Sequence, residues 1–198
     1  MKKLLLTCLA ASMVTLTGCR KEEKLTITNH AEIISTAADM SEYRWIQEPY
    51  AEYRKISFDE LNAFFDKKAS GILYLGYDGC PYCERAIVEL NEVCRKYSIT
   101  VYYAELDPYV SEDEFMSEEQ YHILTDENHI GSILMDGEGG EKALYVPLVI
   151  GVKDGKITGS FTSLVDNFEI TSDDAQMNES QKKEQQKIYT DIIRKTAD

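Results

Sequence analysis

Residues 72–83 read ILYLGYDGCPYC, and this stretch decides the fold. Its first six residues form a short apolar run, which is typical of a buried strand. Pro81 then stands where a first helical residue would, a place at which its missing N–H costs nothing. The stretch therefore predicts a strand that leads directly into a helix, with Cys80 and Cys83 at the junction.

The patterns on either side of this junction extend the prediction over most of the chain. In chain order they indicate a helix from 57, a strand over 72–77, a helix over 81–97, a strand over 100–106, a helix around 112–124, hairpin strands over 148–152 and 156–161, and a helix over 181–195. A parallel pair joined by a helix and followed by an antiparallel hairpin predicts an α/β fold, a mixed sheet with helices on both faces.

The N-terminus reads as an export signal. Two lysines precede an apolar stretch over 4–16 that is too short for an ordinary membrane-spanning helix. It ends in Leu-Thr-Gly-Cys at 16–19, which resembles the lipobox of bacterial lipoproteins. We expect residues 1–18 to be a lipoprotein signal peptide and Cys19 to carry the lipid, which holds the protein at the membrane. An uncleaved anchor with an incidental cysteine is the alternative.

Charge and composition limit the partners. The chain has a formal charge of −14, and the part after the signal would have −16 because two lysines leave with it. This charge argues against nucleic acid as a partner, and against attachment to anionic lipid by charge alone. We expect a lipid-anchored protein on the extracytoplasmic face of the cell membrane. Residues 19–55 would be a tether and N-terminal extension, and 56–198 one domain with an acidic insert at about 109–145.

The two cysteines at the junction have the spacing of a redox site. A sulfur at a helix N-terminus is favoured as a thiolate by unpaired N–H groups and the helix dipole, and such sites titrate at roughly 3.5 to 7.5. Cys80 could then attack another disulfide, and Cys83, one turn on, could resolve the mixed disulfide. This redox-active pair needs no bound cofactor and no metal. The alternatives are a structural disulfide, or half of a zinc site completed by His122 and His129.

The strand–CPYC–helix unit, together with the Val146–Pro147 step before the later hairpin, resembles the thioredoxin superfamily over about 56–197. The CPYC spelling is that of glutaredoxins, and with the lipid anchor the chain is similar to thioredoxin-like and bacteriocin-transport-accessory-like proteins of Gram-positive bacteria. The resemblance implies a thioredoxin-like fold and a cis Pro147 beside the two sulfurs. It also implies that Val146 offers backbone groups to an extended substrate, with Pro81 and Tyr82 supporting the pair.

Two positions depart from the family pattern. Thioredoxins have a buried aspartate about six residues before the first cysteine and a partner lysine in the next strand. Tyr74 and, near the second position, Tyr103 stand there instead. Two carboxylates, Asp78 and Glu84, flank the cysteine pair and would raise thiol pKa values, against the helix effect.

The residues and the resemblance together predict a thiol–disulfide oxidoreductase. Its substrates would be exported proteins or peptides, and a membrane or extracellular redox partner would recycle it. The alternative is a non-catalytic envelope interaction module with a structural disulfide, for which the acidic insert would serve in docking. A buried, inert Cys80 would favour the module. A third cysteine, Cys94, lies on the apolar face of the predicted helix and is expected in the core.

The lipobox resemblance makes a direct prediction about the mature chain. Protein made in a bacterial host should begin at Cys19 and carry two or three acyl groups, as measured by intact-mass spectrometry. A chain that begins elsewhere, without lipid and freely secreted, would contradict it.

Overall fold

The computed structural model describes residues 24–106, 117–137, 140 and 142–198. Its main sheet has six strands, which are β1 (Thr36–Ala37), β2 (Tyr53–Lys55), β3 (Gly71–Gly76), β4 (Val101–Glu105), β7 (Leu148–Lys153) and β8 (Lys156–Thr162). They lie in the order β1-β2-β4-β3-β7-β8. β2, β4 and β3 are parallel, whereas β1 is antiparallel to β2, β7 to β3 and β8 to β7.

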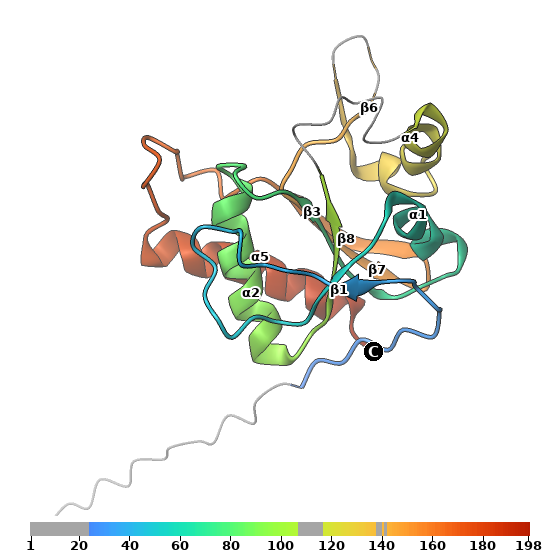
Figure 1. Cartoon of the computed structure of the whole chain (residues 1–198), viewed down its shortest axis with the longest axis horizontal. Coiled ribbons are helices and arrows are strands. Elements are labelled where there is room, and N and C mark those ends of the chain that lie inside the picture. Colours follow the sequence, from blue (N-terminus) through green and yellow to red (C-terminus); the bar gives the residue numbers. More distant parts are fainter. Residues whose placement is uncertain (1–23, 107–116, 138–139, 141) are drawn as a thin grey trace, which may run out of the picture.

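Helices cover both faces of this sheet (Figure 1). The helical elements are α1 (Phe58–Asp66), α2 (Cys83–Tyr97), α4 (Glu118–Leu124), the 3-10 turn η1 (Ile130–Ile133) and α5 (Glu179–Thr196). α2 and α5 lie on one face, and α1 and α4 lie on the other. A separate two-stranded ribbon pairs β5 (Met135–Asp136) with β6 (Lys142–Ala143). The predicted α/β class, with a mixed sheet and helices, is therefore confirmed.

β3 is buried along its whole length because it contributes to both cores. Side chains alternate along a strand, so Ile72 and Tyr74 join the core beneath α2 and α5. Leu73 and Leu75 join the opposite core, beneath α1. Since β3 is central, the turn that follows it begins from a fixed position.

The N-terminal extension belongs to the same sheet as the residues after 56. It supplies β1 and β2, and β2 pairs with β4. Five of its side chains are buried in the core beneath α2 and α5, namely those of Leu25, Met40, Tyr43, Ile46 and Tyr53. The extension is therefore part of the folded body on the helical face that carries the cysteines.

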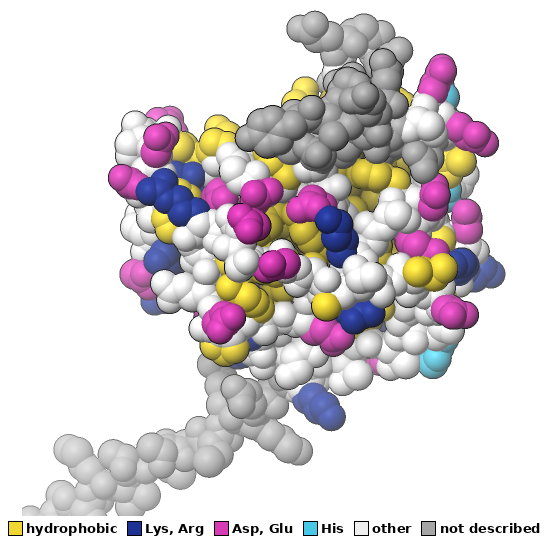
Figure 2. All heavy atoms as spheres, viewed as in Figure 1, with side chains coloured by type: hydrophobic (Ala, Val, Ile, Leu, Met, Phe, Trp, Pro, Cys, Tyr) yellow, Lys and Arg dark blue, Asp and Glu magenta, His cyan; other side chains and the backbone are white. Residues whose placement is uncertain are grey.

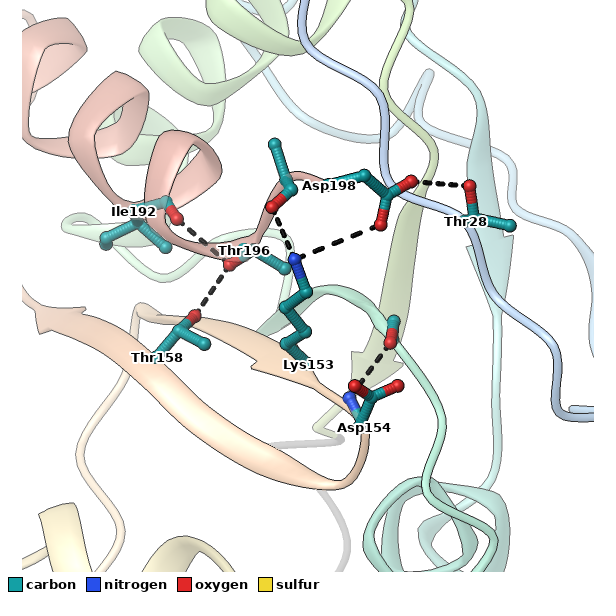
Figure 3. Close-up of polar contacts among 9 residues, drawn as sticks. Thr28, Lys153, Asp154, Thr158, Ile192, Thr196 and Asp198 are labelled. Atoms are coloured by element: carbon teal, nitrogen blue, oxygen red, sulfur yellow. Dashed lines mark hydrogen bonds and ion pairs between the residues drawn. The ribbon is translucent and has the colours of Figure 1, made fainter.

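The C-terminus of α5 is fastened to the β7–β8 hairpin (Figure 3). The Thr196 hydroxyl donates to the Ile192 carbonyl at 2.9 Å and lies 2.7 Å from the Thr158 hydroxyl. Gly151 makes room for it, because a Cβ there would lie 2.2 Å from Thr196 Oγ1. Lys153 donates to the Ala197 carbonyl at 2.6 Å. The hairpin and the last helix thus hold each other in register.

The Thr196 hydroxyl should stabilise the fold. Thr196→Val keeps the shape but removes the link to Thr158, so we expect a loss of about 1 kcal/mol in the free energy of unfolding. Thr190→Val is the matched control, because the Thr190 hydroxyl bonds only within α5, to the Gln186 carbonyl, in the contacts described. Urea denaturation should show a lower midpoint for Thr196→Val with an unchanged slope. Equal losses for the two variants would show that the contact with the hairpin contributes nothing.

Candidate active site at the start of α2

Cys80 and Cys83 lie where β3 ends and α2 begins, as predicted. Both are thiols in this structure. The Cys80 carbonyl accepts the first helical hydrogen bond, from the Glu84 N–H at 2.9 Å. The helical hydrogen bonds therefore start at Cys80, and Pro81 has the first-residue position expected for it. The regular helix begins at Cys83.

The Cys80 sulfur caps this helix. The backbone N–H of Cys83 donates to Cys80 Sγ at 3.2 Å, which is the bond that an N-cap side chain makes with the third residue of a helix. A negative sulfur at this place is stabilised by the unpaired N–H groups of the first turn. The two-residue spacing thus places one sulfur at the helix end and brings the other residue's backbone to it.

The two thiols have opposite pKa shifts. A hydrogen bond from the Cys83 thiol, with the backbone N–H groups of Cys83 and Tyr82, lowers the pKa of Cys80 from 9.0 to about 7, despite its burial. Burial, and then the nearby Cys80 sulfur, raises the pKa of Cys83 far above its ordinary value. Cys80 is 5% exposed and Cys83 is fully buried. Cys80 is therefore both the more acidic thiol and the one nearer to solvent.

The flanking carboxylate of Glu84 has a structural contact that sequence reasoning missed. It accepts hydrogen bonds from the Gly79 N–H at 3.0 Å and the Arg44 N–H at 2.6 Å. Glu84 thus joins the turn before Cys80 to the N-terminal extension. Its negative charge does raise the pKa of Cys80, as expected, but as a smaller effect than the hydrogen bonds that lower it.

Arg85 is a second residue that sequence reasoning missed. It is almost fully buried at 2% exposure. Its guanidinium donates to four backbone carbonyls, those of Pro81, Ser172, Asp173 and Ala175. The Trp45 ring of the extension lies 4.5 Å from its Cζ atom. A charged residue on the buried face of a helix could have indicated these contacts from the sequence, because a buried arginine needs hydrogen-bond acceptors.

Val146 and Pro147 lie directly before β7. The peptide bond between them is cis, as predicted, and Pro147 is buried. The last paired residues of β3 and β7 are Leu75 and Leu148, so the register places Pro147 opposite Gly76. An ideal Cβ on Gly76 would lie 3.1 Å from Cys83 Sγ. The proline and the buried sulfur therefore lie at the same end of β3.

Tyr82 has a half-exposed side chain. It is 46% exposed and makes no capping hydrogen bond. Its contribution to the Cys80 pKa comes through its backbone N–H. The exposed ring belongs to the residue directly before Cys83.

Tyr74 and Tyr103 are neighbours across β3 and β4. Their ring centroids lie 5.6 Å apart, and Tyr43 packs against both at 6.5 and 6.3 Å. The Tyr43 and Tyr103 hydroxyls are 3.0 Å apart. We call these three residues the tyrosine cluster. It lies beneath Cys83, and the contribution of Tyr43 was not predicted.

The remaining candidates lie apart from this pair or outside the described residues. Cys94 is fully buried, and burial raises its pKa well above the ordinary value. Over residues 24–106, 117–137 and 142–198, no three His, Cys, Asp or Glu side chains gather as a metal site. His122 pairs with Glu118, and His129 contacts Asp66 and packs on Phe65. Residue 19 and part of the acidic insert, 107–116, are outside the described residues.

No protein-family model and no curated protein matches the chain. In the part of the chain that the structure describes, no helix has the length and apolarity needed to span a bilayer.

The pKa of Cys80 should be measurable by alkylation. In the reduced protein, the rate of Cys80 modification by iodoacetamide should rise with pH through a midpoint of about 7, because only the thiolate reacts. Cys83→Ala removes the largest cause of the low pKa, so the midpoint should move up towards 9. Cys94→Ala is the control and should leave it unchanged. A wild-type midpoint near 9, read by mass spectrometry of the labelled peptide, would contradict the asymmetry.

Proposed function

We propose that the chain is an extracytoplasmic thiol–disulfide oxidoreductase with a thioredoxin-like fold, acting on exported proteins or peptides. Cys80 is the attacking thiol and Cys83 is the resolving thiol. The observation that carries the proposal is the polarised pair itself, in which the Cys80 sulfur accepts a hydrogen bond from the Cys83 N–H at 3.2 Å. A central strand leading into a CPYC helix start, with cis Pro147 at the same end of the sheet, supports the thioredoxin-like assignment.

The reaction proceeds in two exchanges. The Cys80 thiolate attacks one sulfur of a substrate disulfide, which forms a mixed disulfide and releases the other substrate sulfur as a thiolate. Cys83 then loses its proton and attacks Cys80 Sγ. The second substrate thiolate leaves as the Cys80–Cys83 disulfide forms. The substrate disulfide has then been reduced by two electrons, and the protein dithiol has been oxidised by two. A redox partner reduces the pair again, and the same steps in reverse would oxidise a substrate.

The placement of the site suits a protein tethered at its N-terminus. Lys24 and Leu25 lie beside Tyr97 and Ser98, where α2 ends. The cysteines are at the other end of this helix (Figure 1), which spans 15 residues and therefore about 22 Å. With Cys19 lipidated, the first described residue is only five positions from the bilayer anchor. The cysteines would then face away from the membrane, towards exported chains.

The surface is consistent with protein substrates and with a site outside the cytoplasm. Acidic side chains are spread over the face seen in Figure 2, among fewer Lys and Arg side chains. This distribution gives no basic tract for a nucleic-acid backbone on the viewed face. The cofactor of the proposed reaction is the protein's own dithiol, and the site is a surface junction that a folded or extended polypeptide could approach.

A second candidate function has one observation in its favour. Cys80 is only 5% exposed, which is what a non-catalytic envelope interaction module with a static disulfide would have. We favour the oxidoreductase because a static disulfide has no need of a thiol with a lowered pKa or of one buried and one outer sulfur.

The two candidates differ in what a single substitution traps. Cys83→Ser should accumulate a mixed disulfide with intact, disulfide-bonded insulin, because Cys80 can attack but nothing resolves the product. Cys80→Ser should abolish exchange and trap almost nothing, and it serves as the matched control. Non-reducing gels followed by peptide mapping read the result.

Trapping by Cys80→Ser and not by Cys83→Ser would reverse the two roles. If neither variant traps and the wild-type protein exchanges no disulfide, the module is the correct function.

A further inference from the structure

The resolving step raises a problem that the tyrosine cluster can solve. Cys83 must lose its proton before it attacks, yet its residue is fully buried and its pKa is raised by that burial. The family's buried aspartate is replaced by Tyr74. A proton on Cys83 therefore needs a route of hydrogen-bonding groups to a base that water can reach.

The inner end of such a route lies over Gly76. An ideal Cβ at Gly76 would be 2.7 Å from the Tyr74 hydroxyl and 3.1 Å from Cys83 Sγ. Both atoms therefore border the small volume that this glycine leaves free. The Tyr74 hydroxyl also lies 3.5 Å from the Cys83 carbonyl. A hydrogen bond between the Tyr74 and Cys83 side chains lowers the pKa of the Cys83 thiol.

The hydroxyls continue outward in one direction. The Tyr43 and Tyr74 rings pack with their centroids 6.5 Å apart, and a side-chain hydrogen bond between them shifts both pKa values. The Tyr43 hydroxyl lies 3.0 Å from that of Tyr103. The Tyr103 hydroxyl donates to Glu105 Oε1 at 3.4 Å. The other carboxylate oxygen, Oε2, bonds to Lys55 at the surface. Glu105 has a side chain that is 35% exposed, so this carboxylate meets solvent.

The three hydroxyls remain protonated over the working range. Burial is the largest cause in each case, and it raises the pKa values of Tyr43, Tyr74 and Tyr103 well above the ordinary value. A neutral hydroxyl donates one hydrogen bond while it accepts another. The cluster can therefore pass a proton along without holding a charge.

We propose that the tyrosine cluster is the proton path of the resolving thiol, with Glu105 as its terminal base. The Cys83 proton moves to Tyr74 Oη as each hydroxyl proton moves one place outward, from Tyr74 to Tyr43, from Tyr43 to Tyr103, and from Tyr103 to the Glu105 carboxylate. The step leaves a Cys83 thiolate, three neutral tyrosines and a protonated Glu105. The thiolate attacks Cys80 Sγ, the substrate thiolate leaves, and Glu105 returns its proton to water.

This inference rests on the proposed function, and it predicts which of the two exchanges each residue affects. The tyrosines are positioning and proton-transfer residues for the second exchange, whereas the attack by Cys80 does not use them. Other titratable groups also face the site. Cys80 faces Cys83 directly, Tyr189 of α5 lies near Cys83, and Asp78 acts on Tyr103. The pH dependence is therefore compared between variants that keep all of these.

The test separates the two exchanges in a single turnover. The full-length reduced protein is mixed with a synthetic peptide that has one internal disulfide. Acid quenching and mass spectrometry then count the mixed disulfide and the released dithiol peptide. Tyr103→Phe and Glu105→Gln should each slow release about tenfold or more at pH 7, in the range of a lost general base, and leave formation within about twofold. With the path cut, release should increase about tenfold per pH unit between about 6 and 9.

Two comparisons distinguish a proton path from a packing effect. Tyr102→Phe removes a hydroxyl from the residue directly before Tyr103, whose ring packs on Phe64 on the other face of the sheet. This variant should leave both exchanges unchanged. The double variant Tyr43→Phe/Tyr103→Phe should release no more slowly than either single variant, because one path can be cut only once.

Normal formation with unchanged release in Tyr103→Phe would overturn the proton path alone. Equal slowing of both exchanges, or additive losses in the double variant, would also overturn it in favour of packing. A wild-type protein that forms no mixed disulfide would overturn the proposed function and the path together.

Discussion

The site depends on the hydrogen bond from the Cys83 N–H to the Cys80 sulfur, which closes the first turn of α2. Because β3 is buried on both faces, its C-terminal end has a fixed position, and α2 must start within a few residues of it. The short turn leaves Cys80 at the rim and directs Cys83 into the core. The difference between the two thiols thus follows from where the strand ends, and only secondarily from neighbouring charges. Asp78 and Glu84 do not reverse it.

The N-terminal extension is the part of the chain whose role changes most when the structure is considered. Its Tyr43 enters the tyrosine cluster, its Arg44 N–H bonds to Glu84, and its Trp45 stacks on Arg85. A tether alone would need none of these contacts. The extension completes the surroundings of the cysteines, so a fragment that begins at residue 56 would lack one hydroxyl of the cluster and one strand next to β4.

Much of the fold was predictable because its signals are local. The run before Cys80 and the Asp154–Gly155 turn, both of whose residues have positive φ, specify β3 and the β7–β8 hairpin from within a few residues. The contacts that could not be predicted join distant segments. β2 is three residues long and charged at two of them, so its place in the sheet depends on pairing with β4. Ser57 caps α1, whereas the Glu60 side chain accepts from the Ile34 N–H of the extension.

The candidate site follows the same division. Cys80, Cys83 and Pro147 were predictable from spacing and resemblance, because each belongs to a short motif. Arg85 and Tyr43 belong to no motif. The side chain of Arg85 is recognisable only by the four carbonyls that surround it, and Tyr43 acts through a residue 60 positions away. Neither contact can be predicted from a local sequence pattern, because each joins residues far apart in the chain.

Buried hydroxyls are easier to accommodate than buried charges. Burying a carboxylate or an ammonium costs roughly several kcal/mol of desolvation free energy for each group. The attraction between the two charges offsets this cost only when their geometry is good. Hydroxyls that are hydrogen-bonded to one another lose much less. Two hydroxyls, on Tyr74 and Tyr103, occupy adjacent positions of β3 and β4 but have ring centroids 5.6 Å apart. The third, on Tyr43, hydrogen-bonds to Tyr103 and packs on Tyr74, so it joins the extension to this face of the sheet by a polar contact in addition to the buried apolar side chains.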